Sequence, residues 1–179
     1  MKDRTLEGKA YGVLDDYGTL TLLRSNEDYV EFRSNFLVDV LGAEHDGMVM
    51  ACPEDGRIPG WATLPYWARA HIKLVHVADG QAIRPTSCNN WFADLREAYD
   101  IDLAGLDTSQ LESTKSMFRN CYCLESLDLS GWDTPVLQDT DRMFNWCLNL
   151  KEAPIVSEDS PIMAEWKNEF APQLEGDER

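Results

Sequence analysis

The chain has 179 residues, 44% of them hydrophobic, which is enough apolar sequence for the core of one domain. Its 32 acidic and 16 basic residues give a formal net charge of -16, which disfavours direct binding to nucleic acid and favours a basic protein partner. No apolar stretch is long enough to cross a membrane, and no secretory signal opens the sequence. We therefore expect a cytoplasmic monomer, or a secreted or cell-surface protein if an upstream signal was removed.

Residues 1–64 are expected to form a β-rich cap region. Residues 10–14 and 19–24 are rich in β-branched and apolar side chains, and they flank an Asp-rich turn that ends at Gly18. This pattern is typical of a β-hairpin. The region therefore begins with two antiparallel strands.

The following sequence is less regular, and the fold of residues 25–60 is left open. Residues 29–40 and 48–52 have the composition of further strands. A short helix is expected at residues 65–70, because Pro65 stands where helices commonly begin.

Phe92, Phe118 and Phe144 stand 26 residues apart, and the sequence between them repeats in step. Residues 91–116 and 117–142 are identical at eight of 26 aligned positions. These pairs are Phe92/Phe118, Asp102/Asp128, Leu103/Leu129, Gly105/Gly131, Asp107/Asp133, Thr108/Thr134, Leu111/Leu137 and Thr114/Thr140. A fixed period between about 20 and 50 residues is the signature of stacked supersecondary units.

Each repeat contains three apolar residues with the spacing L-x-x-L-x-L, which is the strand pattern of a leucine-rich repeat. The predicted parallel strands cover residues 72–77, 98–103, 124–129 and 150–155. The sequence therefore predicts an α+β architecture, a short solenoid of about four repeats over residues 65–156, with the three phenylalanines stacked in its core.

The end of the chain, residues 157–179, is expected to form a capping helix and an acidic tail. Ser160 and Pro161 suit the first two positions of a helix, and Ile162, Trp166 and Phe170 follow as an apolar stripe. A helix here would cover the last repeat, although a partner-binding helix is the alternative.

Residues 117–134, with the sequence MFRNCYCLESLDLSGWDT, closely resemble the BspA-type leucine-rich repeat of bacterial proteins. Members of that family repeat a pattern close to MFxxCxxLxxLDLSxxDTS. The lead-in sequence at residues 11–22 is also similar to that found before such repeats. The resemblance implies a right-handed solenoid and a role in protein binding or adhesion, often at the cell surface of host-associated bacteria.

The sequence offers little support for catalysis, a cofactor or a metal. No P-loop, dinucleotide-binding or serine-nucleophile motif is present. Five cysteines are an odd number for a disulfide framework and indicate reduced thiols. Cys121 and Cys147 occupy equivalent positions of adjacent repeats, where small apolar side chains fit the core, although a metal site formed by Cys121, Cys123 and Cys147 is the alternative.

Side chains that flank the inward apolar positions would lie on one strand-lined face. The candidate partner-binding residues there are His76, Tyr99, Asp100, Asp102, Glu125, Asp128 and Glu152. Carboxylates at equivalent positions of strands about 4.8 Å apart repel one another unless something neutralises them. The face has three interpretations: solubility charge, a docking surface for a basic partner, or a divalent-cation site.

Two functions follow from these features. The first is a non-catalytic protein–protein interaction module of the BspA-like leucine-rich-repeat type, which binds a basic protein through this face. The alternative is an acidic DNA mimic or inhibitor of phage or mobile-element origin, which would block a nucleic-acid-processing enzyme. An enzyme is the third class, and no motif favours it.

Overall fold

The computed structural model describes residues 8–15, 17–26, 48–78 and 83–174, with side chains as far as Phe170. Its regular β-structure is one mixed sheet of five strands in the order β3-β1-β2-β4-β5. The strands are β1 (Lys9–Leu14), β2 (Thr19–Ser25), β3 (Met48–Ala51), β4 (Leu74–Val77) and β5 (Asp100–Asp102). Strand β1 is antiparallel to β2 and β3, whereas β4 is parallel to β2 and β5 is parallel to β4.

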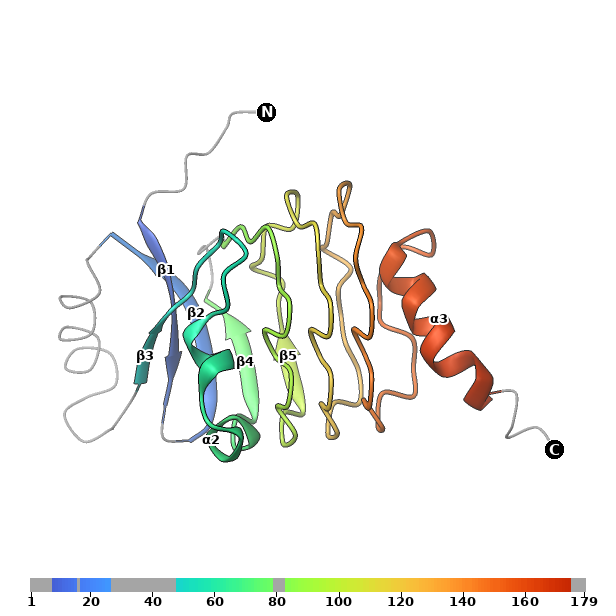
Figure 1. Cartoon of the computed structure of the whole chain (residues 1–179), viewed down its shortest axis with the longest axis horizontal. Helices are drawn as coiled ribbons and strands as arrows, with labels where there is room; N and C mark the ends of the chain where they lie inside the picture. Colours follow the sequence, from blue (N-terminus) through green and yellow to red (C-terminus); the bar gives the residue numbers. More distant parts are fainter. Residues whose placement is uncertain (1–7, 16, 27–47, 79–82, 175–179) are drawn as a thin grey trace.

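The helical elements of the described residues are the 3-10 helix η1 (Gly60–Thr63) and the α-helices α2 (Tyr66–Ala70) and α3 (Pro161–Leu174). Helix α3 lies at the end of the molecule opposite the sheet (Figure 1). Within the described ranges, no helix has both the length and the apolarity needed to span a membrane.

The N-terminal hairpin is confirmed, and Asp15 holds its turn. The Asp15 Oδ1 atom accepts hydrogen bonds from the backbone N–H groups of Tyr17 (3.0 Å) and Thr19 (2.8 Å). Gly18 follows with a φ of 89°, a left-handed conformation that glycine adopts without a steric penalty. The strand at residues 48–51 and the helices α2 and α3 are also confirmed. The strand expected at residues 29–40 lies outside the described residues.

The prediction of a leucine-rich-repeat solenoid is wrong. The structure has a single mixed sheet that is not curled, and only two of the four predicted parallel strands form, as β4 and β5. The hairpin strands join β4 directly, because β2 pairs with it in parallel register from Thr19–Leu74 to Leu22–Val77. Residues 124–129 and 150–155 form no strand and are held by isolated bridges and turn hydrogen bonds.

A shift in register explains part of this error. Asp128 is bridged to Ile155, 27 residues away, so the spacing of 26 ends here. Pro154 is buried, whereas Ala153 and Ile155, both expected inside, are exposed. Because proline has no backbone N–H, it cannot complete a ladder of hydrogen bonds at this position.

The spacing of 26 residues is nevertheless present in the contacts of the stacked segments that carry Phe92, Phe118 and Phe144, which we call the central segments. Phe92 and Phe118 stack with ring centroids 5.9 Å apart, and Phe118 and Phe144 stack at 6.0 Å. All three rings are fully buried, as the prediction required. The segments that carry them run side by side between the sheet and α3 (Figure 1).

Main-chain hydrogen bonds join each of these segments to the next. The N–H of Phe92 donates to the carbonyl of Met117 (3.0 Å), and the N–H of Phe118 donates to that of Met143 (2.9 Å). The backbone turns sharply on both sides of each phenylalanine, where six residues other than glycine have positive φ angles. They are Asn90, Asp94, Ser116, Asn120, Arg142 and Trp146, which fall into two series with a spacing of 26.

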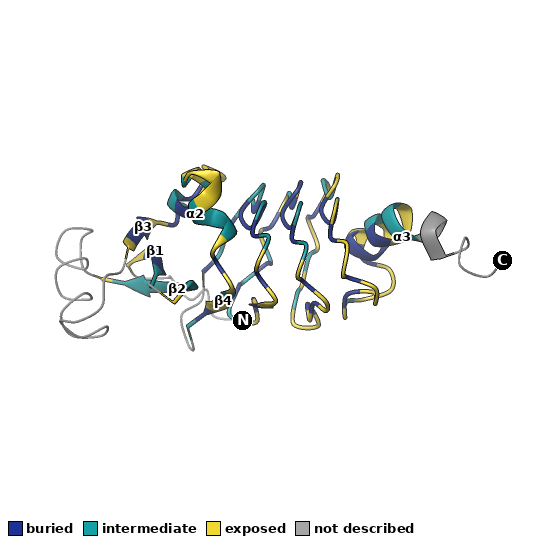
Figure 2. Cartoon of the chain, turned by 90° about the horizontal axis from the view of Figure 1, so that it is seen from below, coloured by how far each residue is buried: buried dark blue, intermediate teal, exposed yellow. Residues whose placement is uncertain are grey.

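The core runs through the whole molecule, from the sheet to α3 (Figure 2). Trp61 joins the sheet to the central segments, since its Nε1 donates to the Trp91 carbonyl (2.8 Å) and its ring meets Trp91 edge to face. The ring also lies directly over Gly12, where an added Cβ would approach within 2.5 Å of it. Gly12 is therefore required for this packing.

Replacing Phe118 with alanine should lower the free energy of unfolding by about 3–5 kcal/mol, because the ring is fully buried between two others. Chemical denaturation measures the change. The exposed Val136 provides the control, and Val136→Ala should cost less than about 0.5 kcal/mol. Equal losses for the two variants would show that the phenylalanine stack is not the core.

Candidate functional site

The predicted partner-binding carboxylates are all exposed, and we call their surface the acidic face. Its members are Asp100, Asp102, Glu125, Asp128 and Glu152. Within the part of the chain that the structure describes, none of them forms an ion pair. Tyr99, beside them in the sequence, is 56% exposed. The five carboxylates of the face therefore have no ion-pair partner among the described residues.

The sheet places the first part of this face. His76 and Asp102 are register partners in β4 and β5. Both side chains are exposed, and the Nδ1 atom of His76 lies 3.5 Å from Thr21 Oγ1. Asp100 is the register partner of Leu74 on the same pair of strands.

Asp102 and Asp128 have a local structural role as well as a charge. Each accepts a hydrogen bond at Oδ1 from the backbone N–H two residues later, Ala104 at 3.0 Å and Ser130 at 2.9 Å. The hydrogen bonds from Ser130 lower the pKa of Asp128, so its carboxylate remains ionised at neutral pH. Because residues 26 apart stack in the neighbouring segments, these two turns occupy equivalent positions in consecutive segments.

The part of the acidic face that Glu125 and Glu152 form is less regular. Glu125 and Glu152 line one shallow pocket of about 380 Å³, together with Lys151. The register shift at Pro154 lies directly after them, and the exposed Lys151 adds a positive charge. The structure thus brings together His76 with Asp102 and Glu125 with Glu152, while Tyr99 is exposed next to Asp100 in the sequence.

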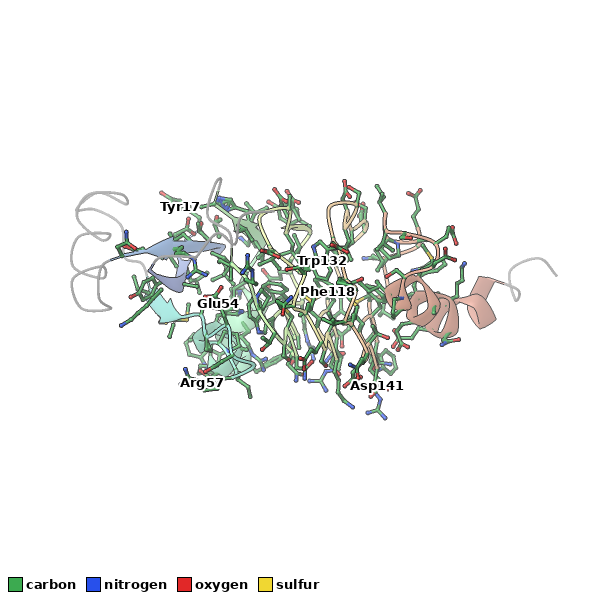
Figure 3. The ribbon with its side chains drawn as sticks, turned by 90° about the horizontal axis from the view of Figure 1, so that it is seen from above. Tyr17, Glu54, Arg57, Phe118, Trp132 and Asp141 are labelled. Carbon is green, nitrogen blue, oxygen red and sulfur yellow. The ribbon has the colours of Figure 1, made fainter. Side chains whose placement is uncertain are left out.

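Several charged groups elsewhere in the molecule form ion pairs. Among the central segments, Arg69 pairs with Asp94 (3.2 Å), Arg84 with Asp107 (2.7 Å) and Lys115 with Asp141 (2.8 Å). Figure 3 shows Asp141 at the edge of the molecule, away from the buried Phe118. The carboxylates of the acidic face differ from these three in having no ion-pair partner among the described residues.

The two cysteines predicted to lie in the core, Cys121 and Cys147, do pack there. Cys121 and Cys147 are fully buried, and their thiols donate to the carbonyls of Phe92 (3.2 Å) and Phe118 (3.0 Å). Burial raises the pKa of both thiols, that of Cys147 to about 12, so neither is a nucleophile at neutral pH. All five cysteines are free. Within the described ranges, no group of three His, Cys, Asp or Glu side chains is placed to hold a metal ion.

Two carboxylates of α3, which the sequence did not single out, have an unexpected role. Glu165 Oε1 accepts a hydrogen bond from the backbone N–H of Arg142 (2.8 Å), and the Glu169 carboxylate is hydrogen-bonded to the backbone of Phe144. In the preceding segments the corresponding N–H groups donate to main-chain carbonyls. Helix α3 therefore supplies side-chain acceptors where no further segment follows. The sequence did contain a signal for this role, because two glutamates four residues apart lie on one face of a helix.

Glu169 is half-buried in an acidic environment. Burial, followed by the neighbouring Glu165, raises its pKa to about 7. A pocket of about 260 Å³ lies beside it, between α3 and the last stacked segment. The residues that line this pocket are Phe144, Asn145, Trp146, Cys147, Leu148, Glu169 and Phe170.

One native-state thiol should react quickly with a thiol reagent, because Cys123 is exposed and the other four cysteines are buried. Unfolding should release all five. A colorimetric thiol titration with and without denaturant measures both numbers. The variant Cys123→Ser should abolish the fast reaction, and a fast reaction that survives in it would contradict the described burial.

Replacing Glu169 with glutamine should change how stability depends on pH. The carboxyl group has a pKa raised from 4.5 to about 7 in the folded protein, so the folded state binds the extra proton in that range and stability falls as pH rises through it. Because the group is half exposed, the loss is about 1–2 kcal/mol rather than the full value of the shift. Denaturation at several pH values should show a flatter profile for Glu169→Gln, and an unchanged slope would contradict the assignment.

Comparisons of the chain with protein-family models, with curated proteins and with solved structures found no match. The candidate site is therefore defined by its geometry and charge. The resemblance to BspA-type repeats is carried by the sequence pattern of residues 117–134, and the leucine-rich-repeat architecture that it implied is not the one that the chain forms.

Proposed function

We propose that the protein is a non-catalytic protein-binding module whose acidic face docks a basic protein partner. The observation that carries the proposal is the set of five exposed carboxylates, none of which forms an ion pair among the described residues. Elsewhere on the central segments, Asp94, Asp107 and Asp141 are paired with cationic side chains. A basic partner would supply the missing charge.

The physical advantage of such a face lies in encounter with the partner. Like charges on neighbouring segments repel one another, and an approaching basic surface relieves this repulsion while it is attracted at long range. Exposed charges of this kind contribute mainly to the association rate and to specificity. The β4–β5 pair and the turns at Asp102 and Asp128 hold the carboxylates in fixed positions.

A duplex mimic needs a long surface of regularly spaced carboxylates. Lys73 and Lys151 are exposed at the two ends of this face, and the register shift at Pro154 ends the regular spacing. These features give that alternative no specific support. A general docking surface for a basic protein requires only local charge complementarity.

Neutralising the face should slow association with a basic probe, for which we choose an immobilised oligolysine peptide. The test variant combines Asp100→Asn, Asp102→Asn, Glu125→Gln and Asp128→Asn. Asparagine retains the oxygen that accepts the turn hydrogen bonds, so the fold is preserved. We expect the association rate at low salt to fall roughly tenfold or more, and its dependence on salt to flatten. Surface plasmon resonance measures both.

A matched variant controls for net charge. It neutralises four exposed carboxylates outside the acidic face, at Glu112, Asp133, Glu158 and Asp159. This variant has the same net charge as the test variant and should keep an association rate within about twofold to threefold of the original protein. If both variants slow association equally, the total charge alone attracts the probe and the acidic face is not a docking surface.

A further inference from the structure

The pocket between α3 and the last stacked segment contains an unsatisfied acceptor. Glu169 Oε2 is buried and has no hydrogen-bond partner among the described residues. A buried carboxylate oxygen without a donor has lost its hydration without gaining a hydrogen bond in return. A donor that entered the pocket would supply this hydrogen bond, so the site is predisposed to bind one.

The groups around Glu169 favour a positively charged donor. On α3 the nearest titratable neighbour is Glu165, whose carboxyl group also shares a hydrogen bond with that of Glu169, and on the segment packed against the helix it is Asp141. The Arg142 guanidinium lies 3.9 Å from Asp141, and the Cys147 thiol stays neutral. Within the described part of the chain, no lysine or arginine pairs with Glu169.

The rim of the pocket is apolar and open to solvent. Trp146 and Leu148 both line it, and each is 61% exposed, which is unusual for large apolar side chains. An indole ring attracts a cation to its face, and an aliphatic side chain packs against an alkyl stem. The pocket therefore combines an apolar entrance with an acidic floor.

The size of the pocket suits one side chain. Pockets for complete small-molecule ligands occupy about 300–1,000 Å³, whereas this one has about 260 Å³. A lysine fits its chemistry better than an arginine, because a single free oxygen matches a compact ammonium group. A guanidinium is bound best by two oxygens side by side.

On the basis of the proposed basic partner, we propose that this pocket receives one lysine side chain of that partner. Its ammonium group donates a hydrogen bond to Glu169 Oε2, and its alkyl stem lies against Trp146 and Leu148. The pocket thus anchors the partner at the α3 end of the molecule, while the acidic face steers its approach.

The direct test uses N-acetyl-lysine methylamide as a probe of the pocket alone. Titration followed by two-dimensional NMR should shift the Trp146 indole signal and the Glu169 amide signal, with saturation. Glu169→Gln should weaken the probe roughly tenfold, since the charge-assisted hydrogen bond is lost. A probe that binds both proteins equally, or that shifts neither signal, would overturn the proposal.

A second variant removes the aromatic wall without straining the backbone. Trp146 has a φ of 64°, and Asn120, at the equivalent position of the preceding segment, has the same φ of 64°. Trp146→Asn therefore keeps a residue that tolerates this conformation. We expect several-fold weaker binding of the probe, and unchanged binding would contradict the role of the ring.

The pH dependence separates the acidic floor from a general apolar pocket. The Glu169 carboxyl group must lose its proton before it can accept from an ammonium group, and its pKa is about 7. Affinity for the probe should therefore rise as pH increases through this value, and the rise should disappear in Glu169→Gln. An affinity that does not change with pH would contradict a role for the carboxylate.

Further experiments distinguish binding in this pocket from binding at the acidic face and from binding of free amines. The four-residue variant of the acidic face should bind N-acetyl-lysine methylamide normally, because its substitutions lie outside the pocket. Glu169→Gln should release oligolysine faster without slowing its association. Putrescine should bind no more tightly than the lysine probe; much tighter binding would make the pocket a polyamine site and overturn the proposal. If the four-residue variant associates with oligolysine as fast as the original protein while the lysine probe still binds the pocket, the proposed function alone is contradicted.

Discussion

The main-chain hydrogen bonds between consecutive central segments are the interaction on which the rest of the structure depends. They pass from Phe92 to Met117 and from Phe118 to Met143, and each bond keeps two aromatic rings in contact. The pattern leaves N–H groups without main-chain acceptors at the last segment. Helix α3 meets this need with Glu165 and Glu169, and it also covers the core with Ile162 and Trp166. The cost is a carboxylate held in a partly buried, acidic environment.

The same arrangement accounts for the surface chemistry. Apolar residues and the thiols of Cys121 and Cys147 fill the interior, so polar residues between them must face solvent. Elsewhere on the surface several of these residues, among them Asp94, Asp107 and Asp141, form ion pairs with partners of opposite charge. On the acidic face they do not, and the fold holds the carboxylates where they repel one another. At the α3 end, the pocket beside Glu169 presents a second uncompensated carboxylate in a different, more enclosed setting.

The sequence predicted the parts of the fold that depend on local rules. The turn at Asp15 and Gly18, the N-terminus of α3 at Ser160, and the burial of the three phenylalanines each follow from a residue type at a required position. The pairing of strands was not predictable in this way, because it depends on hydrogen bonds between segments that are far apart in the sequence. The hairpin joined β4 through long-range pairing, and one shifted residue at Pro154 ended the regular spacing. The acceptor roles of Glu165 and Glu169 were missed. They arise only because no further segment follows the one that carries Phe144, so that its N–H groups need side-chain acceptors.

Amide hydrogen exchange tests the central claim most directly, namely that hydrogen bonds between segments hold the molecule together and that α3 completes them. The amides of Phe92 and Phe118 should exchange only on global unfolding. Those of Arg142 and Phe144, whose acceptors are side chains of α3, should be protected in the original protein and should lose protection when Glu165 and Glu169 are both replaced by alanine. Exchange of the Phe92 and Phe118 amides at the rate of exposed turn residues would contradict the account.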